Sequence, residues 1–298
     1  MRILITGASG MLGTPLVEAY RALHDVLGLS RHRPPTAGVD WAECDISVRG
    51  EFTRIARRYR PQVVVHAAAL TNVDECEREP ELATRVNRDS VEEVAAYCAD
   101  NGAKLIHVST DAVFDGTKNG LYTELDAAAP PHVYGRTKLA AERFALTAGG
   151  ALVLRTNVFG WRPGRADSLA EWILQGLRAQ ARLTMFTDVL FTPIATQLLA
   201  PTIVRCSEAG IAGLYHAGGS EAISKHEFSL RIAAAYGLST ACIEPISVDD
   251  KPAAARRAKN MGLDSTKLER VLGRSLPGVD ESVAAWQAAE PNRGTYHE

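Results

Sequence analysis

The chain has 298 residues, 46% of them hydrophobic and 23% charged, and its formal net charge is −2 at pH 7. A chain of this length buries a sizeable core, and its near-neutral charge gives no electrostatic reason to expect nucleic acid or an anionic membrane as a partner. No apolar run reaches the roughly 20 residues that span a bilayer, and five cysteines without a Cys-x-x-Cys pair predict free thiols, a cytoplasmic protein and no metal site.

Short apolar segments alternate with helical patterns over the first 156 residues. Strands are predicted at 2–6, 25–30, 62–66, 104–109 and 151–155, and helices at 14–23, 47–59, 80–99 and 133–146. The strand candidates lack polar alternation, which is typical of strands that are buried on both faces of a parallel sheet. The alternation of strand and helix then predicts an α/β fold with a doubly wound sheet.

The pattern after residue 156 is less regular. A strand at 213–216 is expected to return to the sheet, and helices are predicted at 167–180, 224–236 and 264–272. Asp167 or Ser168 is a candidate N-cap, Ser224 and Glu227 have the spacing of a capping box, and Gly273 follows the last helix. We expect one domain over residues 1–156, with a return near 187–217, and a smaller C-terminal lobe over residues 157–186 and 218–298.

A glycine-rich turn follows the first predicted strand and precedes a helix. Its sequence, Gly7-Ala8-Ser9-Gly10-Met11-Leu12-Gly13, has the spacing G-x-x-G-x-x-G. Glycine lets the backbone turn tightly and approach a pyrophosphate, and the N–H groups of the next helix then face the phosphates. A glycine-rich surface turn has the same composition, but the position between strand and helix favours a dinucleotide site. The residues predicted to bind the cofactor are Gly7, Ser9, Gly10, Met11, Leu12 and Gly13.

The end of the second strand distinguishes NAD from NADP. An acidic residue at this point binds the ribose diol of NAD, whereas this chain has Ser30-Arg31-His32-Arg33. Ser30 can hydrogen-bond a phosphate, and Arg31 or Arg33 can pair with it. The segment therefore favours NADP(H), with a solvated cationic loop as the alternative.

Two further segments are candidates for cofactor contacts. Asp45 and Ile46 are placed to meet the adenine edge, although Asp45 is equally suited to cap a helix that begins at Ser47. Ala67, Ala68 and Ala69 follow the strand at 62–66. Their small side chains would let the dinucleotide lie flat against the backbone, and they would equally allow tight packing of helix on sheet.

Tyr134 and Lys138 lie four residues apart in a predicted helix, so they share one face. A nearby ammonium lowers the pKa of a phenol, which would let Tyr134 donate a proton to a carbonyl oxygen as hydride arrives; Lys138 would also bind the nicotinamide ribose. Thr110, at the end of a predicted strand, would hydrogen-bond the carbonyl and the phenol. A half-buried tyrosine beside a lysine with an exposed ammonium is the structural alternative.

With these motifs together, the chain resembles the extended short-chain dehydrogenases and, more narrowly, the dTDP-4-dehydrorhamnose reductase family. The matching stretches are 7–13, 66–74, 109–116, 122–124, 134–138, Glu142, 154–156, 192–193, 213–216 and 263–268. The resemblance implies a Rossmann-type NADP-binding domain with a C-terminal substrate-binding lobe. It also implies reduction of a keto group, at C4, of a nucleotide-linked deoxysugar, with Thr110, Tyr134 and Lys138 as the catalytic set.

The resemblance also implies a substrate pocket with an altered wall. The residues expected to border the sugar are Thr71, Asp111, Val113, Phe114 and Asn157. The family has a tyrosine where this chain has Ala112, and its tryptophan after the Arg-Thr pair is displaced here to Trp161. Loss of a large aromatic side chain removes a stacking surface and makes room, so the reaction class is predicted more firmly than the sugar.

Two other functions are compatible with the same motifs. The regulatory β subunit of methionine adenosyltransferase is similar in these segments, so a non-catalytic NADP-binding subunit is one alternative. A nucleotide-sugar epimerase or dehydratase is the other, but the Ser30-Arg31 segment speaks against the tightly held NAD(H) of such enzymes. The oligomeric state stays open, and a homodimer is compatible with the sequence.

Overall fold

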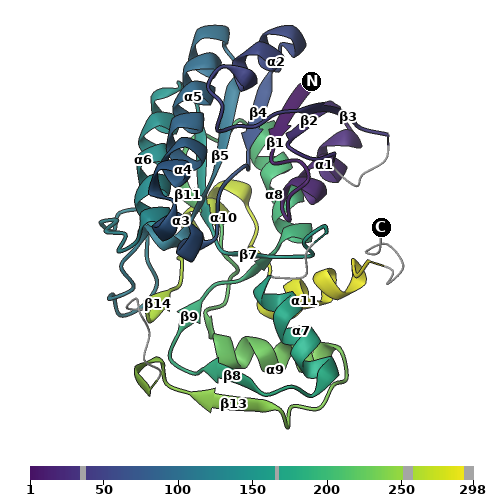
Figure 1. Cartoon of the computed structure of the whole chain (residues 1–298), viewed down its shortest axis with the longest axis vertical. Coiled ribbons are helices and arrows are strands. Elements are labelled where there is room, and N and C mark those ends of the chain that lie inside the picture. Colours follow the sequence, from purple (N-terminus) through teal and green to yellow (C-terminus); the bar gives the residue numbers. More distant parts are fainter. Residues whose placement is uncertain (34–37, 165–167, 251–257, 292–298) are drawn as a thin grey trace. The chain divides into compact units, whose positions relative to one another are not determined.

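The computed structural model describes residues 1–33, 38–164, 168–250 and 258–291 of the chain (Figure 1). The chain divides into two compact units. Unit 1 comprises Met1–Phe114, Ala127–Arg155 and Ala200–Tyr215, and unit 2 comprises Asp115–Asp126, Thr156–Leu199 and His216–Glu298. Among the described residues, no helix has the length and apolar character needed to cross a membrane. The same residues hold no group of three or more His, Cys, Asp or Glu side chains that is placed to bind a metal ion.

Unit 1 is built on a seven-stranded sheet. Its strands are β1 (Arg2–Thr6), β2 (Asp25–Ser30), β3 (Asp40–Glu43), β4 (Val63–His66), β5 (Lys104–Thr110), β6 (Leu152–Thr156) and β11 (Gly213–His216). Their order is β11-β6-β5-β4-β1-β2-β3, so the chain builds outward on both sides of β1, and β1 pairs in parallel with β2 and β4. This arrangement confirms the predicted doubly wound α/β fold.

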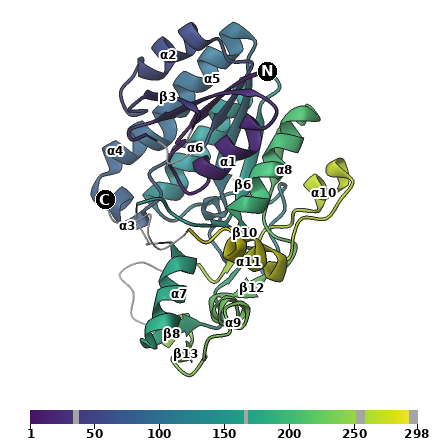
Figure 2. The same ribbon diagram turned by 90° about the vertical axis from the view of Figure 1, so that its right-hand side faces the viewer.

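Helices cover both faces of this sheet. They are α1 (Gly13–Arg21), α2 (Glu51–Tyr59), α3 (Val73–Arg78), α4 (Pro80–Thr84), α5 (Ser90–Asn101) and α6 (Val133–Thr147). Side chains of α2, α5 and α6 form one core cluster with the strands, including Phe52, Val94 and Ala141 with Val64. On the other face, α1 lies beside the part of α8 (Thr196–Glu208) that belongs to unit 1 (Figure 2). Coverage of both faces explains why all four residues of β4 are buried.

A single π-helical turn, Arg85–Asp89, joins α4 to α5 where one continuous helix was predicted. Asn87 in this turn is fully buried. Its side-chain amide donates to the carbonyl of Leu70 at 3.0 Å, and its Oδ1 accepts from the N–H of Leu70 at 2.8 Å. Asn87 also donates to Oγ1 of Thr137 at 3.3 Å. The π turn therefore holds the loop after β4 beside α6.

The helix predicted to begin at Ser47 begins at Glu51 instead. Oδ1 of Asp45 accepts from the N–H of Ser47 at 2.9 Å and from its hydroxyl at 2.7 Å, which forms a local turn. Gly50 then has a φ of 92°, outside the helical range. Asp45 therefore does not cap α2, and that interpretation of Asp45 is wrong.

Unit 2 contains short strands and longer helices. Its small sheets pair β7 (Val158–Phe159) with β10 (Ile194–Ala195), β8 (Leu183–Phe186) with β13 (Ile243–Ile246), and β9 (Leu190–Phe191) with β12 (Ile223–Ser224) and β14 (Asn260–Met261). Its helices are α7 (Leu169–Ala179), α9 (Lys225–Ala235), α10 (Thr266–Leu272) and α11 (Val279–Ala288). Ser168 forms a capping box with Glu171, Ser224 accepts from the N–H of Glu227, and Gly273 ends α10 at a φ of 65°. Asp167 lies outside the described residues.

Candidate active site

The glycine-rich turn between β1 and α1 is wound so tightly that no side chain would fit at Gly7 or Gly13. The N–H of Gly10 donates to the carbonyl of Gly7 at 2.8 Å, and Gly7 has a φ of 69°. A Cβ on Gly13 would lie 1.9 Å from the carbonyl oxygen of Gly7, and one on Gly7 would lie 2.8 Å from the backbone nitrogen of Ala68. The turn thus brings the backbone after β1 against the backbone after β4, at the point where strand order reverses. This close backbone approach suits a pyrophosphate at the start of α1.

Substitution of Gly13 by alanine is expected to weaken NADPH binding about 10- to 100-fold, because overpacking costs about 1–3 kcal/mol and the turn must open to admit the methyl group. Fluorescence titration of NADPH measures the effect. Gly149→Ala is the control, since a Cβ there would meet no atom within 4 Å. Wild-type affinity in the Gly13 variant would show that the turn does not bind the cofactor.

The residues predicted to meet the adenosine end lie after β2 and β3. The hydroxyl of Ser30 donates to the carbonyl of His32 at 2.5 Å and accepts from Nε1 of Trp41 at 2.9 Å. Arg31 is exposed, and Ile46 is half-buried against the core of unit 1. Burial opposes ionisation of Asp45, but the bonds from Ser47 and the charge of Arg31 outweigh it, so the pKa of Asp45 lies below its ordinary value. Arg31 therefore lies near enough to Asp45 to act on it electrostatically.

The backbone after β4 lies close to the glycine-rich turn. The N–H of Ala68 donates to Oγ1 of Thr6 at 3.3 Å, and Thr6 also lies 3.1 Å from Nδ1 of His66. Ala67, Ala68 and Ala69 are each partly exposed. Their small side chains therefore leave an accessible backbone surface next to Gly7, as a flat-lying dinucleotide requires.

Thr110 and Tyr134 meet at the carboxyl end of β5. Burial raises the pKa of the Tyr134 phenol above its ordinary value, and the side chain of Thr110 lies close enough to act against this rise. Thr110 also accepts from the N–H of Ala112 at 3.1 Å and donates to Asp111 at 3.0 Å. The phenol of Tyr134 is thus held protonated, as a group that can donate a proton.

Lys138 is buried in the same region, with 2% of its surface exposed. Its Nζ donates to the carbonyl of Val108 at 2.7 Å and lies 3.2 Å from Nε2 of His107. Burial lowers the pKa of Lys138 to about 8, against an opposing effect of Glu142. The expected lowering of the Tyr134 pKa by Lys138 is not found, because the ammonium is directed toward β5 and burial dominates the environment of the phenol.

Two histidines behind Lys138 were not identified from the sequence. The rings of His66 and His107 stack with centroids 5.6 Å apart. Burial, with a contribution from Lys138, lowers the pKa of His66 to about 3 and that of His107 well below its ordinary value. Both imidazoles are therefore neutral, and Nε2 of His107 can accept from the Lys138 ammonium. The sequence pattern of β5 does not predict the contact between His107 and Lys138, because that contact depends on how α6 packs on the sheet.

A buried ion pair supports the end of β5. Arg155 binds Glu142 through Nε at 2.9 Å and Nη2 at 2.7 Å, and the hydroxyl of Ser109 donates to the same carboxylate at 2.5 Å. The guanidinium of Arg155 also lies 5.0 Å from the ring centroid of Phe114. Glu142 lies one helical turn after Lys138 on α6. The ion pair therefore fixes α6 against β6, which carries Arg155, and the bond from Ser109 fixes α6 against β5, which carries Thr110. The sequence indicated Glu142 and Arg155 only as residues shared with the family and did not predict that they form an ion pair.

The residues expected to border a substrate lie in different environments. Thr71 is exposed in the loop after β4, Asp111 is buried next to Thr110, and Asn157 belongs to unit 2. Val113 and Phe114 have no exposed surface and contribute to the core of unit 1. Their predicted positions beside a sugar stay predictions.

The two departures from the family pattern have distinct structural roles. The carbonyl of Ala112 approaches Gly135 so closely that a Cβ at position 135 would lie 2.2 Å from it. Trp161 stacks on the fully buried Trp286 with ring centroids 4.5 Å apart, and its Nε1 donates to the carbonyl of Trp286 at 2.8 Å. Trp161 is therefore part of the core of unit 2.

Comparison with known proteins gives consistent results. The family described as the RmlD substrate binding domain matches residues 1–290. The chain is 33% identical over 294 residues to "Probable low-salt glycan biosynthesis reductase Agl14" of Haloferax volcanii, covering 97% of this chain and 98% of that protein. It is also similar to the crystal structure of dTDP-4-dehydrorhamnose reductase from Bacillus anthracis in complex with NADP, with a TM-score of 0.86, 25% identity, and coverage of 97% and 99%.

A relative with a different name has comparable identity. Methionine adenosyltransferase 2 subunit beta of Mus musculus is 32% identical over 308 residues, covering 95% of this chain and 87% of that protein. Sequences similar to this chain therefore occur in proteins named as reductases and in one named as a subunit of methionine adenosyltransferase.

Proposed function

The chain belongs to the RmlD substrate binding domain family, and we propose that it uses NADPH to reduce a keto group, at C4, of a nucleoside-diphosphate-linked deoxysugar. The observation that carries the proposal is the pairing of the Thr110 and Tyr134 side chains at the end of β5, next to the buried Lys138. It supplies a protonated phenol and a hydroxyl donor at the strand end where doubly wound folds bind their ligands. The reductase names of the relatives support the same reaction class.

The protein residues would act on the carbonyl oxygen. The turn Gly7–Gly13 and the segment Ala67–Ala69 would hold NADPH, which would supply the hydride when bound. Tyr134 would donate its phenolic proton to the developing alkoxide. The Thr110 hydroxyl, which donates to Asp111 here, would turn to donate a hydrogen bond to the same oxygen. Lys138 is charged below about pH 8 and provides a positive charge beside the site, as well as a donor for the nicotinamide ribose.

The cofactor and the substrate would be bound by different parts of the chain. We propose that residues 1–156, with the return near 187–217, hold NADP(H), and that residues 157–186 and 218–298 bind the nucleotide-linked sugar. Thr71, Asp111, Val113, Phe114 and Asn157 are the proposed substrate residues. The half-buried Ala112, in place of the family's tyrosine, would leave room beside the sugar, so the accepted sugar would differ from that of the rhamnose pathway.

Arg31→Ala is expected to raise the KM for NADPH about tenfold and to leave the KM for NADH unchanged, because a charge-assisted bond to the 2′-phosphate contributes about 1.5 kcal/mol or more. Initial rates with both cofactors measure this. Arg143→Ala, which removes an exposed charge from α6, is the control. Equal efficiency with NADH and NADPH, unchanged by Arg31→Ala, would contradict the proposed NADP(H) preference.

The reaction is tested by following NADPH absorbance with a panel of nucleotide-linked 4-keto sugars. Oxidation of NADPH that requires the sugar establishes the reductase activity. The sugar that reacts fastest shows which substrate the pocket accepts. NAD(H) that stays bound during turnover without net consumption would instead support an epimerase or dehydratase.

A non-catalytic subunit is the second candidate function, favoured by the 32% identity to methionine adenosyltransferase 2 subunit beta. In that case NADPH would bind tightly, every ketosugar would be inert, and the protein would form a stable complex with a partner enzyme. The intact Thr110, Tyr134 and Lys138 favour the reductase.

A further inference from the structure

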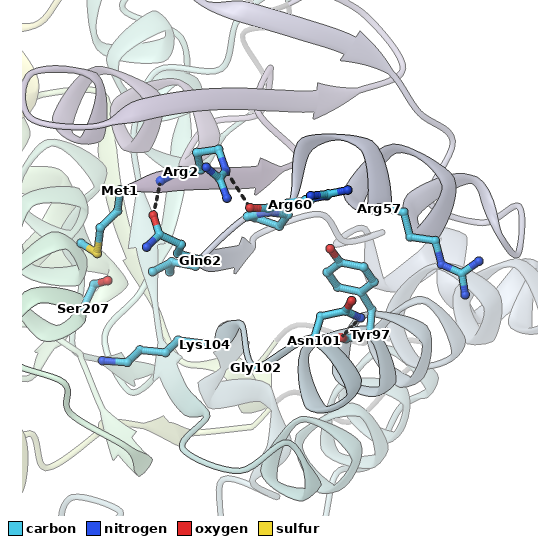
Figure 3. Close-up of a pocket in the computed structure, with 12 residues that line it drawn as sticks. Met1, Arg2, Arg57, Arg60, Gln62, Tyr97, Asn101, Gly102, Lys104 and Ser207 are labelled. Carbon is cyan, nitrogen blue, oxygen red and sulfur yellow. Dashed lines mark hydrogen bonds between the residues drawn. The ribbon is translucent and has the colours of Figure 1, made fainter.

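A cavity lies in unit 1 at the opposite end of the sheet from the glycine-rich turn (Figure 3). It has a volume of about 500 Å³ and is bordered by the first residues of β1, β4 and β5 and by the C-terminal ends of α2 and α5. This size is in the range of small-molecule sites. The proposed reaction uses none of these residues.

The wall of this cavity carries positive charge and no carboxylate. Its lining includes four cationic side chains, namely Arg2, Arg57, Arg60 and Lys104, and no Asp or Glu. Within the described parts of the chain, none of the four forms an ion pair. The C-terminal ends of α2, α5 and α8 contribute only about half a negative charge each. The cavity therefore keeps a net positive charge.

Hydrogen bonds hold part of this wall in place. The backbone N–H of Arg2 donates to Oε1 of Gln62 at 3.0 Å, and Nε of Arg2 donates to the carbonyl of Arg60 at 2.8 Å. Arg60 has a positive φ of 54°. Figure 3 shows Arg60 and Gln62 on one side of the opening and Lys104 on another, with Tyr97 and Asn101 from α5 closing the wall. These bonds tie Arg2 to Arg60 and Gln62.

The lining also limits what the cavity can recognise. Tyr97 is its only aromatic residue, 5% exposed, and its hydroxyl donates to the carbonyl of Ala56 at 2.9 Å. The positive charges of Arg57 and Arg60 act against the rise in the Tyr97 pKa that burial causes, so both act at the cavity. No exposed ring is available to stack on a nucleobase. Recognition must therefore depend on charge and on the amide groups of Gln62 and Asn101.

From this geometry we propose that the cavity is a binding site for a compact polyanion with two phosphate groups, such as pyrophosphate or the diphosphate group of a small metabolite. The guanidinium groups of Arg2 and Arg60 would donate charge-assisted hydrogen bonds to phosphate oxygens. The exposed side chains of Arg57 and Lys104, whose charged ends point outward in Figure 3, would turn inward to do the same. The site is separate from the proposed cofactor turn, because Arg2 and Gly7 lie beyond opposite ends of the apolar part of β1.

Calorimetric titration of pyrophosphate into the full chain, at low ionic strength and with saturating NADPH, tests the proposal. Lys104→Gln and Arg60→Gln are each expected to weaken binding about tenfold, and added salt should weaken wild-type binding more steeply than binding to either variant. Arg58→Gln is the matched control, because Arg58 is exposed in the same last turn of α2 and does not line the cavity. Lys104→Arg keeps the charge and should keep the affinity.

The possible results separate this site from the cofactor site. Saturable binding that depends on Arg60 and Lys104 but not on Arg58 supports the cavity, even if NADPH turns out not to bind. Absence of saturable binding, or equal losses in all three glutamine variants, overturns it, as does an affinity that none of them changes. Comparison of pyrophosphate, orthophosphate and a nucleoside diphosphate then distinguishes an inorganic from an organic source.

Discussion

Replacement of Tyr134 by phenylalanine is expected to lower kcat about 100- to 10,000-fold, the usual contribution of a positioned proton donor. The variant keeps the ring and its stacking on His132, with centroids 6.1 Å apart, and loses only the hydroxyl on which Thr110 acts. NADPH affinity should stay close to the wild-type value. Steady-state rates with the best ketosugar, together with an NADPH titration, measure both quantities.

The control for this variant is Tyr59→Phe. Tyr59 lies on α2, and its hydroxyl donates to the carbonyl of Asp25 at 2.9 Å, so that variant also loses one phenolic hydrogen bond. Its kcat should remain that of the wild type. A Tyr134→Phe enzyme that retained most of its kcat would assign proton donation to another group, whereas loss of NADPH binding would show that the phenol has a structural role.

Removal of the Glu142 carboxylate is expected to lower the free energy of unfolding by about 3–5 kcal/mol, because Glu142→Ala leaves Arg155 charged, buried and without its partner. Side-chain exposures of 5% for Arg155 and 3% for Glu142 mean that water cannot replace the lost contact. Since domains have about 5–15 kcal/mol of stability in total, the variant would be close to unfolding at physiological temperature. Urea denaturation followed by circular dichroism measures the change.

An exposed ion pair provides the comparison for Glu142. Arg182 and Glu244 are 76% and 46% exposed, and Glu244→Ala should cost no more than about 1 kcal/mol. The double variant with Glu142→Leu and Arg155→Met should be more stable than Glu142→Ala, because no unpaired charge remains. Equal effects of Glu142→Ala and Glu244→Ala would show that the buried pair contributes little.

The sheet of unit 1 could be predicted because its strands are apolar on both faces. Five predicted strands match β1, β2, β4, β5 and β6 to within a residue or two at each end. In unit 2, strands such as β7 and β10 have two residues each, too few to show any periodicity. Helix α8 contains Pro201, a residue that normally interrupts helices, and was predicted only as part of a return to the sheet.

The candidate site could be predicted as a set of residues but not as a set of contacts. Glycine spacing and the four-residue separation of Tyr134 and Lys138 depend on local geometry, which the sequence carries directly. The contact of Lys138 with His107 and the bond from Ser109 to Glu142 join α6 to β5, and such contacts depend on the packing of one element on another. The ionisation of Tyr134 was misjudged for the same reason, since burial is a property of the folded chain.

The π turn at Arg85–Asp89 constrains how this chain can be recombined with its relatives. A π turn holds one more residue than the α-helical turn it replaces. Removal of that residue would rotate the preceding helix α4 by about 100° relative to α5. Asn87 would then point away from Leu70 and Thr137, to which it is hydrogen-bonded. Chimeric proteins that exchange segments within this family should therefore place their junctions outside residues 85–89, and length differences there should be tolerated less well than in the loops.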